Sequence, residues 1–292
     1  MAIAWPLLLA QLFNGLVLGS LLMLVAMGLT IIFGTLGVIN FAHGALYMVG
    51  AYVGYVVYQG THSFGLALLG GSLFLVVLGM VIERVIVRAY YARPIEDQIL
   101  VTFGIAIILI EIVRAAFGSI SQRVPVPGWG QGAVDLGLLF YPRYRFMVLG
   151  IVALTLLTIY LVLYRTKLGL IVRAGIEDRR MVNILGINVS RTFLVVFSLG
   201  AMVAGFAGII NAPLVSVTPD MGADVLVQSF VVVVSGGVGS FPGAILGGII
   251  AGEILSLTAM VSPAYSQVML YAAMAVVLIV RPQGLLGTKE RE

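Results

Sequence analysis

The stretch Phe33–Tyr52, FGTLGVINFAHGALYMVGAY, places an Asn, a His and four glycines between two long apolar runs. Glycine interrupts helical hydrogen bonding readily. In hydrocarbon, the backbone groups that are released must find partners in protein or in a water-filled cavity. This stretch therefore predicts helices that stop and restart inside a membrane protein.

The composition of the whole chain agrees with this class of protein. Hydrophobic residues make up 61% of the 292 residues and charged residues 10%, whereas a soluble domain carries about 25% charged residues. There is no Cys, which excludes disulfides and thiolate metal sites. We expect an all-α, polytopic transmembrane helix bundle, with no metal or cofactor site of its own and no cleaved signal peptide.

Apolar segments long enough to approach a membrane crossing of about 20 residues recur along the chain. We expect about 8–10 spans and a single transmembrane domain over residues 1–292. The nine candidates are 7–33, 41–59, 64–82, 98–117, 146–164, 192–214, 225–240, 243–260 and 267–281.

Basic residues orient this bundle. Twelve of the 16 Lys and Arg fall in the gaps after spans three and five and at the C-terminal end, which nine spans place on one side. The positive-inside rule makes that side cytoplasmic. The N-terminus is then expected outside and the C-terminus in the cytoplasm, in a multi-pass membrane protein.

A second break resembles the first. Residues 234–248, VSGGVGSFPGAILGG, interrupt apolar sequence between spans seven and eight. Paired Gly/Pro-interrupted segments in two halves of a transporter point to the translocation path. The candidate path or gate residues in the two breaks are Asn40, His43, Gly44, Gly236, Gly237, Gly239 and Ser240. Close helix packing through small residues is the alternative explanation of these glycines, and a buried structural histidine that of His43.

Charges inside the apolar segments are the next candidates. Glu253 lies mid-span in GGIIAGEILSL with no basic neighbour in sequence. Because an intramembrane carboxylate is costly, it is a candidate path residue as well, or else it is neutral or paired with another helix. Glu111 and Arg114, spaced three apart, favour a self-satisfied pair on one helix face.

The gap between spans five and six carries a compact charged segment, RTKLGLIVRAGIEDRRMVNILGINVSR, over residues 165–191. Its spacing predicts one short helix near 169–187 outside the bilayer. Charged residues lie on one face of this helix, and the opposite, apolar face comprises Ile171, Ala174, Met181, Ile184 and Leu185. Such a helix can lie on anionic lipid, but its acidic residues favour insertion into a protein groove.

Several of these segments together resemble one family. NGLVLGSLLMLVAMGLTIIFGTLGVINFAHGALYMVGAY, GLIVRAGIEDRRMVNILGIN, GGVGSFPGAILGG and RPQGLLG occur in the order found in the membrane permeases of bacterial branched-chain amino acid ABC importers. The resemblance covers almost the whole chain. It implies import of branched-chain or other hydrophobic amino acids by alternating access, with no enzyme activity in this chain.

The resemblance also implies partners. These are a second homologous permease, two cytoplasmic ATPase subunits and a periplasmic substrate-binding protein, besides membrane lipid and without nucleic acid. The segment near 169–187 would be the coupling helix that docks on an ATPase. The positions assigned to that role are Arg173, Ala174, Gly175, Glu177, Asp178, Met181 and Gly186. The chain has no GxxxxGK[ST] phosphate loop, so ATP and Mg²⁺ would be bound by the partners.

Other functions stay open at this point. Permeases of the same superfamily carry urea, short amides or aromatic acids, and a permease for nucleosides or sugars is a related alternative. A passive channel belongs to a different class, but the filter signatures of ring carboxylates or TVGYG carbonyls are absent from the sequence. An intramembrane enzyme lacks support, because the only two histidines stand in no catalytic motif.

Overall fold

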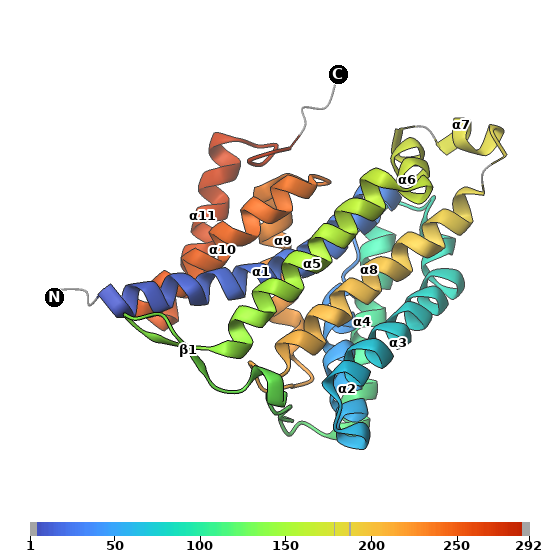
Figure 1. The fold of residues 1–292 in the computed structure, drawn as a ribbon. Coiled ribbons are helices and arrows are strands. Elements are labelled where there is room, and N and C mark those ends of the chain that lie inside the picture. The colour runs from blue at the N-terminus through green and yellow to red at the C-terminus, as the bar shows by residue number, and fades with distance from the viewer. Residues whose placement is uncertain (1–4, 178, 187, 288–292) are drawn as a thin grey trace. The chain divides into compact units, whose positions relative to one another are not determined.

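The computed structural model describes residues 5–177, 179–186 and 188–287 of the chain. These residues fold mainly into helices, and the longest connection, residues 118–142, joins α4 to α5 (Figure 1). The helices of the first half are α1 (Trp5–Leu36), α2 (His43–Thr61), α3 (Phe64–Val85), η1 (Val87–Tyr90), α4 (Ile95–Phe117) and η2 (Gly128–Gly130). Those of the second half are α5 (Arg143–Arg165), α6 (Lys167–Glu177), α7 (Arg179–Ile184), α8 (Val189–Asn211), α9 (Met221–Gly236), α10 (Phe241–Val261), η3 (Pro263–Tyr265) and α11 (Ser266–Val280).

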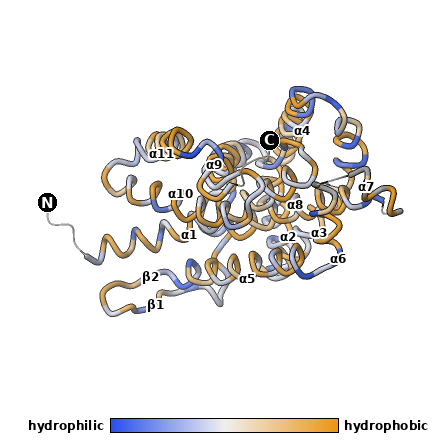
Figure 2. The backbone as a smooth tube through the Cα atoms, turned by 90° about the horizontal axis from the view of Figure 1, so that it is seen from above, coloured by the Kyte–Doolittle hydropathy of each residue, from blue (hydrophilic) through white to orange (hydrophobic). Residues whose placement is uncertain are grey.

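The expected all-α class is confirmed. The described strands are β1 (Ala133–Asp135) and β2 (Phe140–Pro142), which pair antiparallel with Val134 opposite Tyr141. All nine expected spans are helices. Within the described part of the chain, seven helical segments are long and apolar enough to cross a membrane by themselves, while α9 is shorter, at 16 residues. Figure 2 shows that apolar residues dominate these long helices, whereas hydrophilic segments lie near α7.

The chain divides into two compact units, and each is described here by itself. The first comprises residues 1–27, 126–153 and 227–292, and the second comprises 28–125 and 154–226. Helices α1, α5 and α9 each contribute residues to both units. At about 1.5 Å per residue, the 32 residues of α1 form a helix longer than a hydrocarbon core of about 30 Å. The helix is therefore long enough to contribute residues to both units.

In the second unit, α2, α3 and α8 pack on one another. Glycines allow this approach: a Cβ atom on Gly50 would meet the backbone of Gly205, and one on Gly208 would meet the carbonyl of Tyr47. Without a hydrophobic driving force between helices in lipid, such close contact supplies much of the packing energy. The spacing Gly50xxxGly54 in α2 is therefore explained by helix packing.

In the first unit, the early part of α1 crosses α10 through two small-residue pairs. A Cβ on Gly19 would meet the carbonyl of Gly248, and one on Gly252 would meet the backbone of Gly15 and Gly19. α10 also contacts η3 and α11. The spacings Gly15xxxGly19 in α1 and Gly248xxxGly252 in α10 are thus explained by one close helix crossing.

Candidate functional site

The break between α1 and α2 is built into the second unit. His43, the first residue of α2, is 0% exposed, and a Cβ on Gly28 would lie 2.7 Å from its Cε1 atom. Gly28 precedes the end of α1 by eight residues, or about 12 Å of helix. The connection 37–42 therefore runs back beside the last two turns of α1, as a re-entrant segment would.

Side chains satisfy the backbone of this connection. Asn40 Oδ1 accepts a hydrogen bond of 3.0 Å from the amide of Ala42, and the carbonyl of Asn40 accepts one of 3.3 Å from His43. From α4, Thr102 Oγ1 accepts a hydrogen bond of 3.1 Å from the amide of Phe41. The Thr102 hydroxyl also lies 3.2 Å from the carbonyl of Ile39. Thr102 thus holds the break to α4, a role the sequence does not indicate.

Two of the predicted path residues in this break have structural contacts that account for them. The ring of His43 fills the space above Gly28, as a structural histidine would. A Cβ on Gly44 would meet the carbonyl of Gly222 in the first turn of α9. Asn40 differs, because it is 1% exposed and no described residue bonds its Nδ2 group. The Asn40 amide therefore has hydrogen-bonding capacity to spare.

The second break, residues 237–240, belongs to the first unit. Gly237 and Gly239 have φ angles of 108° and 79°, which L side chains rarely adopt. Ser240 caps α10, since its Oγ accepts a hydrogen bond of 3.1 Å from the amide of Gly243. Gly236 packs against the backbone of Gly243, so that the two helix ends meet closely.

The C-terminal tail completes this break. The amide of Leu285 donates to the carbonyl of Ser235 at 2.8 Å, and that of Leu286 donates to the carbonyl of Gly236 at 2.9 Å. These two carbonyls end α9 and would otherwise lack a helical partner. The tail 281–287 therefore replaces the helical hydrogen bonds that the break removes. The sequence showed this tail as a family motif without indicating its contact.

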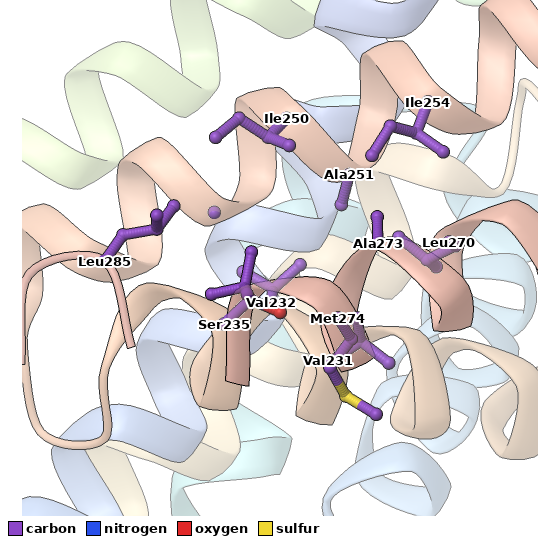
Figure 3. A pocket seen from close by; sticks show the side chains of 12 residues that line it. Val231, Val232, Ser235, Ile250, Ala251, Ile254, Leu270, Ala273, Met274 and Leu285 are labelled. Atoms are coloured by element: carbon purple, nitrogen blue, oxygen red, sulfur yellow. The ribbon is translucent and has the colours of Figure 1, made fainter. Parts of the chain in front are cut away.

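Leu285 of the same tail also closes a small apolar cavity (Figure 3). The cavity lies between α9, α10 and α11, and Val231, Ile254 and Met274 are among its lining residues. Ser235 contributes a buried hydroxyl that no described residue bonds. The break in the first unit is thus packed on its apolar side as well as hydrogen-bonded at its backbone.

Glu253 lies on the face of α10 that crosses α1. A Cβ on Gly15 would lie 2.6 Å from its Oε2 atom. Within residues 5–177, 179–186 and 188–287, no hydrogen-bond partner reaches the buried Oε2. The expectation that Glu253 is paired with another helix is not met by a described charge. The carboxyl group instead covers a glycine of α1.

Further polar side chains line the same crossing. The Ser256 hydroxyl donates to the carbonyl of Gln11 at 2.6 Å, and Asn14 donates to Oε1 of Gln11 at 3.2 Å. Asn14 Oδ1 accepts in turn from the hydroxyl of Tyr141 at 3.0 Å and from Arg145. Burial raises the pKa of the Tyr141 phenol, and Arg145 beside it opposes this. This polar chain reaches α10 one turn from Glu253.

The segment after α5 forms two helices, α6 and α7, in place of the single helix expected near 169–187 (Figure 1). Gly175 lies in the last turn of α6, and glycine is a poor helix former, which favours an end there. Gly186 has a φ angle of 79° in the turn that leads to α8. Asp178 lies outside the described residues, and the side chains of 175–177 are not described either.

The root of this segment is fixed to α5. A Cβ on Gly169 would meet the backbone of Leu163. Arg173 donates to the carbonyl of Leu163, and its guanidinium group lies 5.2 Å from the ring of Tyr164. Arg173 thus bonds its own chain, at the carbonyl end of α5 where a cation is favoured.

Outward from that root, most of the predicted apolar face is exposed, whereas Ile171 is half-buried. Met181, Ile184 and Leu185 are 53%, 72% and 69% exposed, and Ala174 is exposed as well. The residues that pack inward are Val172 and Val182, which the periodicity analysis did not select. This exposed surface, Met181, Ile184 and Leu185, is called the docking face below.

Charged pairs stand at the other end of the second unit. Arg114 pairs with Glu111, as the spacing predicts, and also with Asp220 at 2.8 Å. Arg114 therefore ties the end of α4 to the connection between α8 and α9. Among the described residues, no group of three or more His, Cys, Asp or Glu is arranged so that it could hold a metal ion.

Comparisons with known proteins place the chain. It is 34% identical to the high-affinity branched-chain amino acid transport system permease protein LivH of Escherichia coli and 31% identical to BraD of Pseudomonas aeruginosa, over 97% of each chain. It is also 28% identical to LivM of E. coli, over 98% of this chain and 72% of LivM. No solved structure matches. The family model for the permease component of branched-chain amino acid transport systems matches residues 11–278, and the chain belongs to that family.

Proposed function

We propose that this chain is the membrane permease subunit of an ABC importer for branched-chain or other hydrophobic amino acids. The observation that carries the proposal is the likeness to LivH and BraD, permease proteins of branched-chain amino acid transport, over 97% of each chain. The likeness to LivM, which comes from the same kind of transport system, supports pairing with a second, homologous permease. Two ATPase subunits and a periplasmic binding protein complete the assembly in the inner membrane.

The docking face supports the place of the ATPase in this proposal. Neighbouring large apolar side chains that face water mark a binding surface, and this charged segment is expected to lie outside the bilayer. Met181, Ile184 and Leu185 stand on a segment whose root is anchored to α5 through Gly169 and Arg173. An ATPase that binds this face can push on α5 and α8. The basic residues around the segment favour its cytoplasmic position, with the N-terminus outside.

The proposed substrate path uses the groups that are left unsatisfied. Asn40 offers a buried amide and Glu253 a buried carboxylate oxygen, each without a described partner. An amide can bind the carboxylate group of an amino acid and a carboxylate can bind its ammonium group, so each of the two residues is by itself a candidate substrate contact. Gly237, Gly239 and Ser240 of the second break allow the helices to rearrange, because their backbone conformations are not helical.

Reconstitution tests this function. The chain is co-purified with its second permease and ATPases, placed in proteoliposomes and supplied with the binding protein and labelled leucine. We expect uptake that requires internal-facing ATP and stops with a non-hydrolysable analogue. Uptake without ATP would instead identify a passive channel. Uptake of urea, a nucleoside or an aromatic acid in preference to leucine would contradict the substrate assignment.

A further inference from the structure

A buried carboxylate lies at the end of α3 where the chain turns toward α4. Glu83 is 0% exposed. Arg88 donates to both of its oxygens, from Nε at 3.2 Å and from Nη2 at 2.9 Å, and the hydroxyl of Tyr91 donates to Oε1 at 2.9 Å. An ionised carboxylate tolerates burial only when it is paired and hydrogen-bonded, and here both oxygens are. Neither the sequence motifs nor the proposed path uses this cluster.

The cluster fixes the connection between α3 and α4 in one geometry. Arg88 is in η1, and its two-pronged bond to Glu83 defines an orientation as well as a distance. The hydrogen bond with Glu83 raises the pKa of the Arg88 guanidinium group, so Arg88 stays protonated. The connection between α3 and α4 is therefore fixed to the end of α3 by this ion pair.

Tyr91 extends the cluster to α8. Its ring meets that of Phe193 edge to face, with the centroids 5.3 Å apart. Phe193 is buried and lies about one turn after the start of α8. Further along, α3 and α8 pack through small residues: a Cβ on Gly79 would lie 2.8 Å from that of Ala201. The aromatic contact thus ties the helices together at the end where glycine packing no longer does so.

The start of α8 directly follows the docking face. α6 and α7 both contact α8, and Asn188 caps α8 by accepting a hydrogen bond of 3.0 Å from the amide of Arg191. A displacement of the docking face therefore acts on the first turns of α8. Phe193 is in the second of these turns, where Tyr91 lies against it.

We infer that Glu83, Arg88 and Tyr91 form a strut that makes the end of α3 follow the start of α8 when an ATPase acts on the docking face. The inference rests on the proposed function. The three residues are positioning residues: they touch neither nucleotide nor substrate. Their work is to keep α3 and α8 one rigid body, so that motion of the docking face reaches the helices that pack on α3.

The first experiment separates coupling from folding. Tyr91→Phe keeps the ring on Phe193 but removes the hydroxyl, and Glu83→Gln removes the charge in nearly the same shape. Each variant is reconstituted in the complete complex, and uptake and ATP hydrolysis are measured together. We expect the ATP hydrolysed per substrate imported to rise roughly fivefold or more, a common size for a lost coupling. Subunit stoichiometry stays that of the wild type.

A matched control is available one residue along. Arg84 follows Glu83 on α3 but is exposed and outside the strut. Arg84→Gln removes a charge of the same helix end, and we expect an unchanged ratio of ATP to substrate. If Tyr91→Phe and Glu83→Gln also leave that ratio unchanged in complexes of normal composition, the strut does not couple the helices.

The second experiment measures the rigid body directly. The chain has no cysteine, so spin labels at Arg84→Cys and Arg191→Cys report only the distance between the two helix ends. In the complex, we expect the same distance distribution without nucleotide and in an ATP-trapped state. With Tyr91→Phe added, the distribution broadens or shifts in the trapped state. A shift in the trapped state without Tyr91→Phe would overturn the inference.

Failure of the docking proposal has a different signature. If the ATPase does not bind the docking face, complexes with a disrupted docking face still assemble and import, whatever the strut variants do. If docking is right and the strut is wrong, disruption of the docking face abolishes import while Tyr91→Phe and Glu83→Gln behave as the wild type.

Discussion

Glu253 covers Gly15: its Oε2 atom lies 2.6 Å from the position that the Cβ of any larger residue at 15 would take. The contact brings a carboxyl group against the backbone of α1, beside the glycine pairs at which α1 and α10 cross. The polar chain of Ser256, Gln11 and Asn14 lies next to it. A costly group in such a place is a candidate for a role beyond packing.

We expect Glu253→Gln to reduce uptake by about tenfold or more while the complex assembles normally, because an amide keeps the volume but loses the negative charge. Initial rates of labelled leucine uptake in proteoliposomes measure this. Ser256→Ala is the control, since it removes a polar group of the same helix face without removing a charge. Wild-type uptake by Glu253→Gln would remove this residue from the path.

Thr102 holds the break before α2 through the amide of Phe41. Thr102→Val keeps the shape but leaves that buried amide without its acceptor, which typically costs about 1–3 kcal/mol. We expect a lower midpoint of thermal unfolding in detergent for Thr102→Val. Thr102→Ser retains the hydroxyl and should recover most of the loss. Equal midpoints for the valine and serine variants would show that the hydrogen bond contributes nothing.

Gly237 and Gly239 form a matched pair in the second break. Both have positive φ, so alanine costs about 1–2 kcal/mol of backbone strain at either position. A Cβ on Gly237 would in addition meet the backbone of Gly287 and lie 3.1 Å from the carbonyl of Gln283, whereas nothing lies within 4 Å at Gly239. Gly237→Ala should therefore lower the unfolding midpoint clearly more than Gly239→Ala. The reverse order would contradict the contact between the break and the tail.

The docking face gives the fourth prediction. Ile184→Asp places a charge in the most exposed of its three apolar side chains. Because burying an unpaired carboxylate is unfavourable, we expect the ATPase subunits to be lost on co-purification while the two permeases stay together. Ser190→Asp adds the same charge at an exposed position just beyond the face and should leave the ATPases bound. ATPase retention by Ile184→Asp would place the interface elsewhere.

Much of this fold was predictable because hydropathy and glycine act locally. All nine apolar segments are helices, and the breaks fall near Asn40 and Ser240, as the residue types there predict. The residues that stabilise the breaks were not predictable. Thr102 lies 61 residues from Phe41, and Ser256 lies 245 residues from Gln11, so no periodicity connects them.

The segment after α5 shows the same limit in another form. Its apolar spacing predicted a helix and a face but could not tell whether that face packs inward, since periodicity is the same for both. The structure buries Val172 and Val182 and exposes Ile184. Glu83 was missed for a related reason: its partners Arg88 and Tyr91 are near in sequence but belong to a connection that no repeat describes.

The hydrogen bond between the amide of Leu285 and the carbonyl of Ser235 can form only late in the synthesis of the chain. Fifty residues separate the donor from its acceptor, and ribosomes add about 5–20 residues per second. The end of α9 thus enters the membrane roughly 3–10 s before the amides that complete it exist. During that interval water or the insertion machinery must donate hydrogen bonds to these carbonyls. A nascent chain arrested before Leu285 should therefore remain accessible to protease at Gly237.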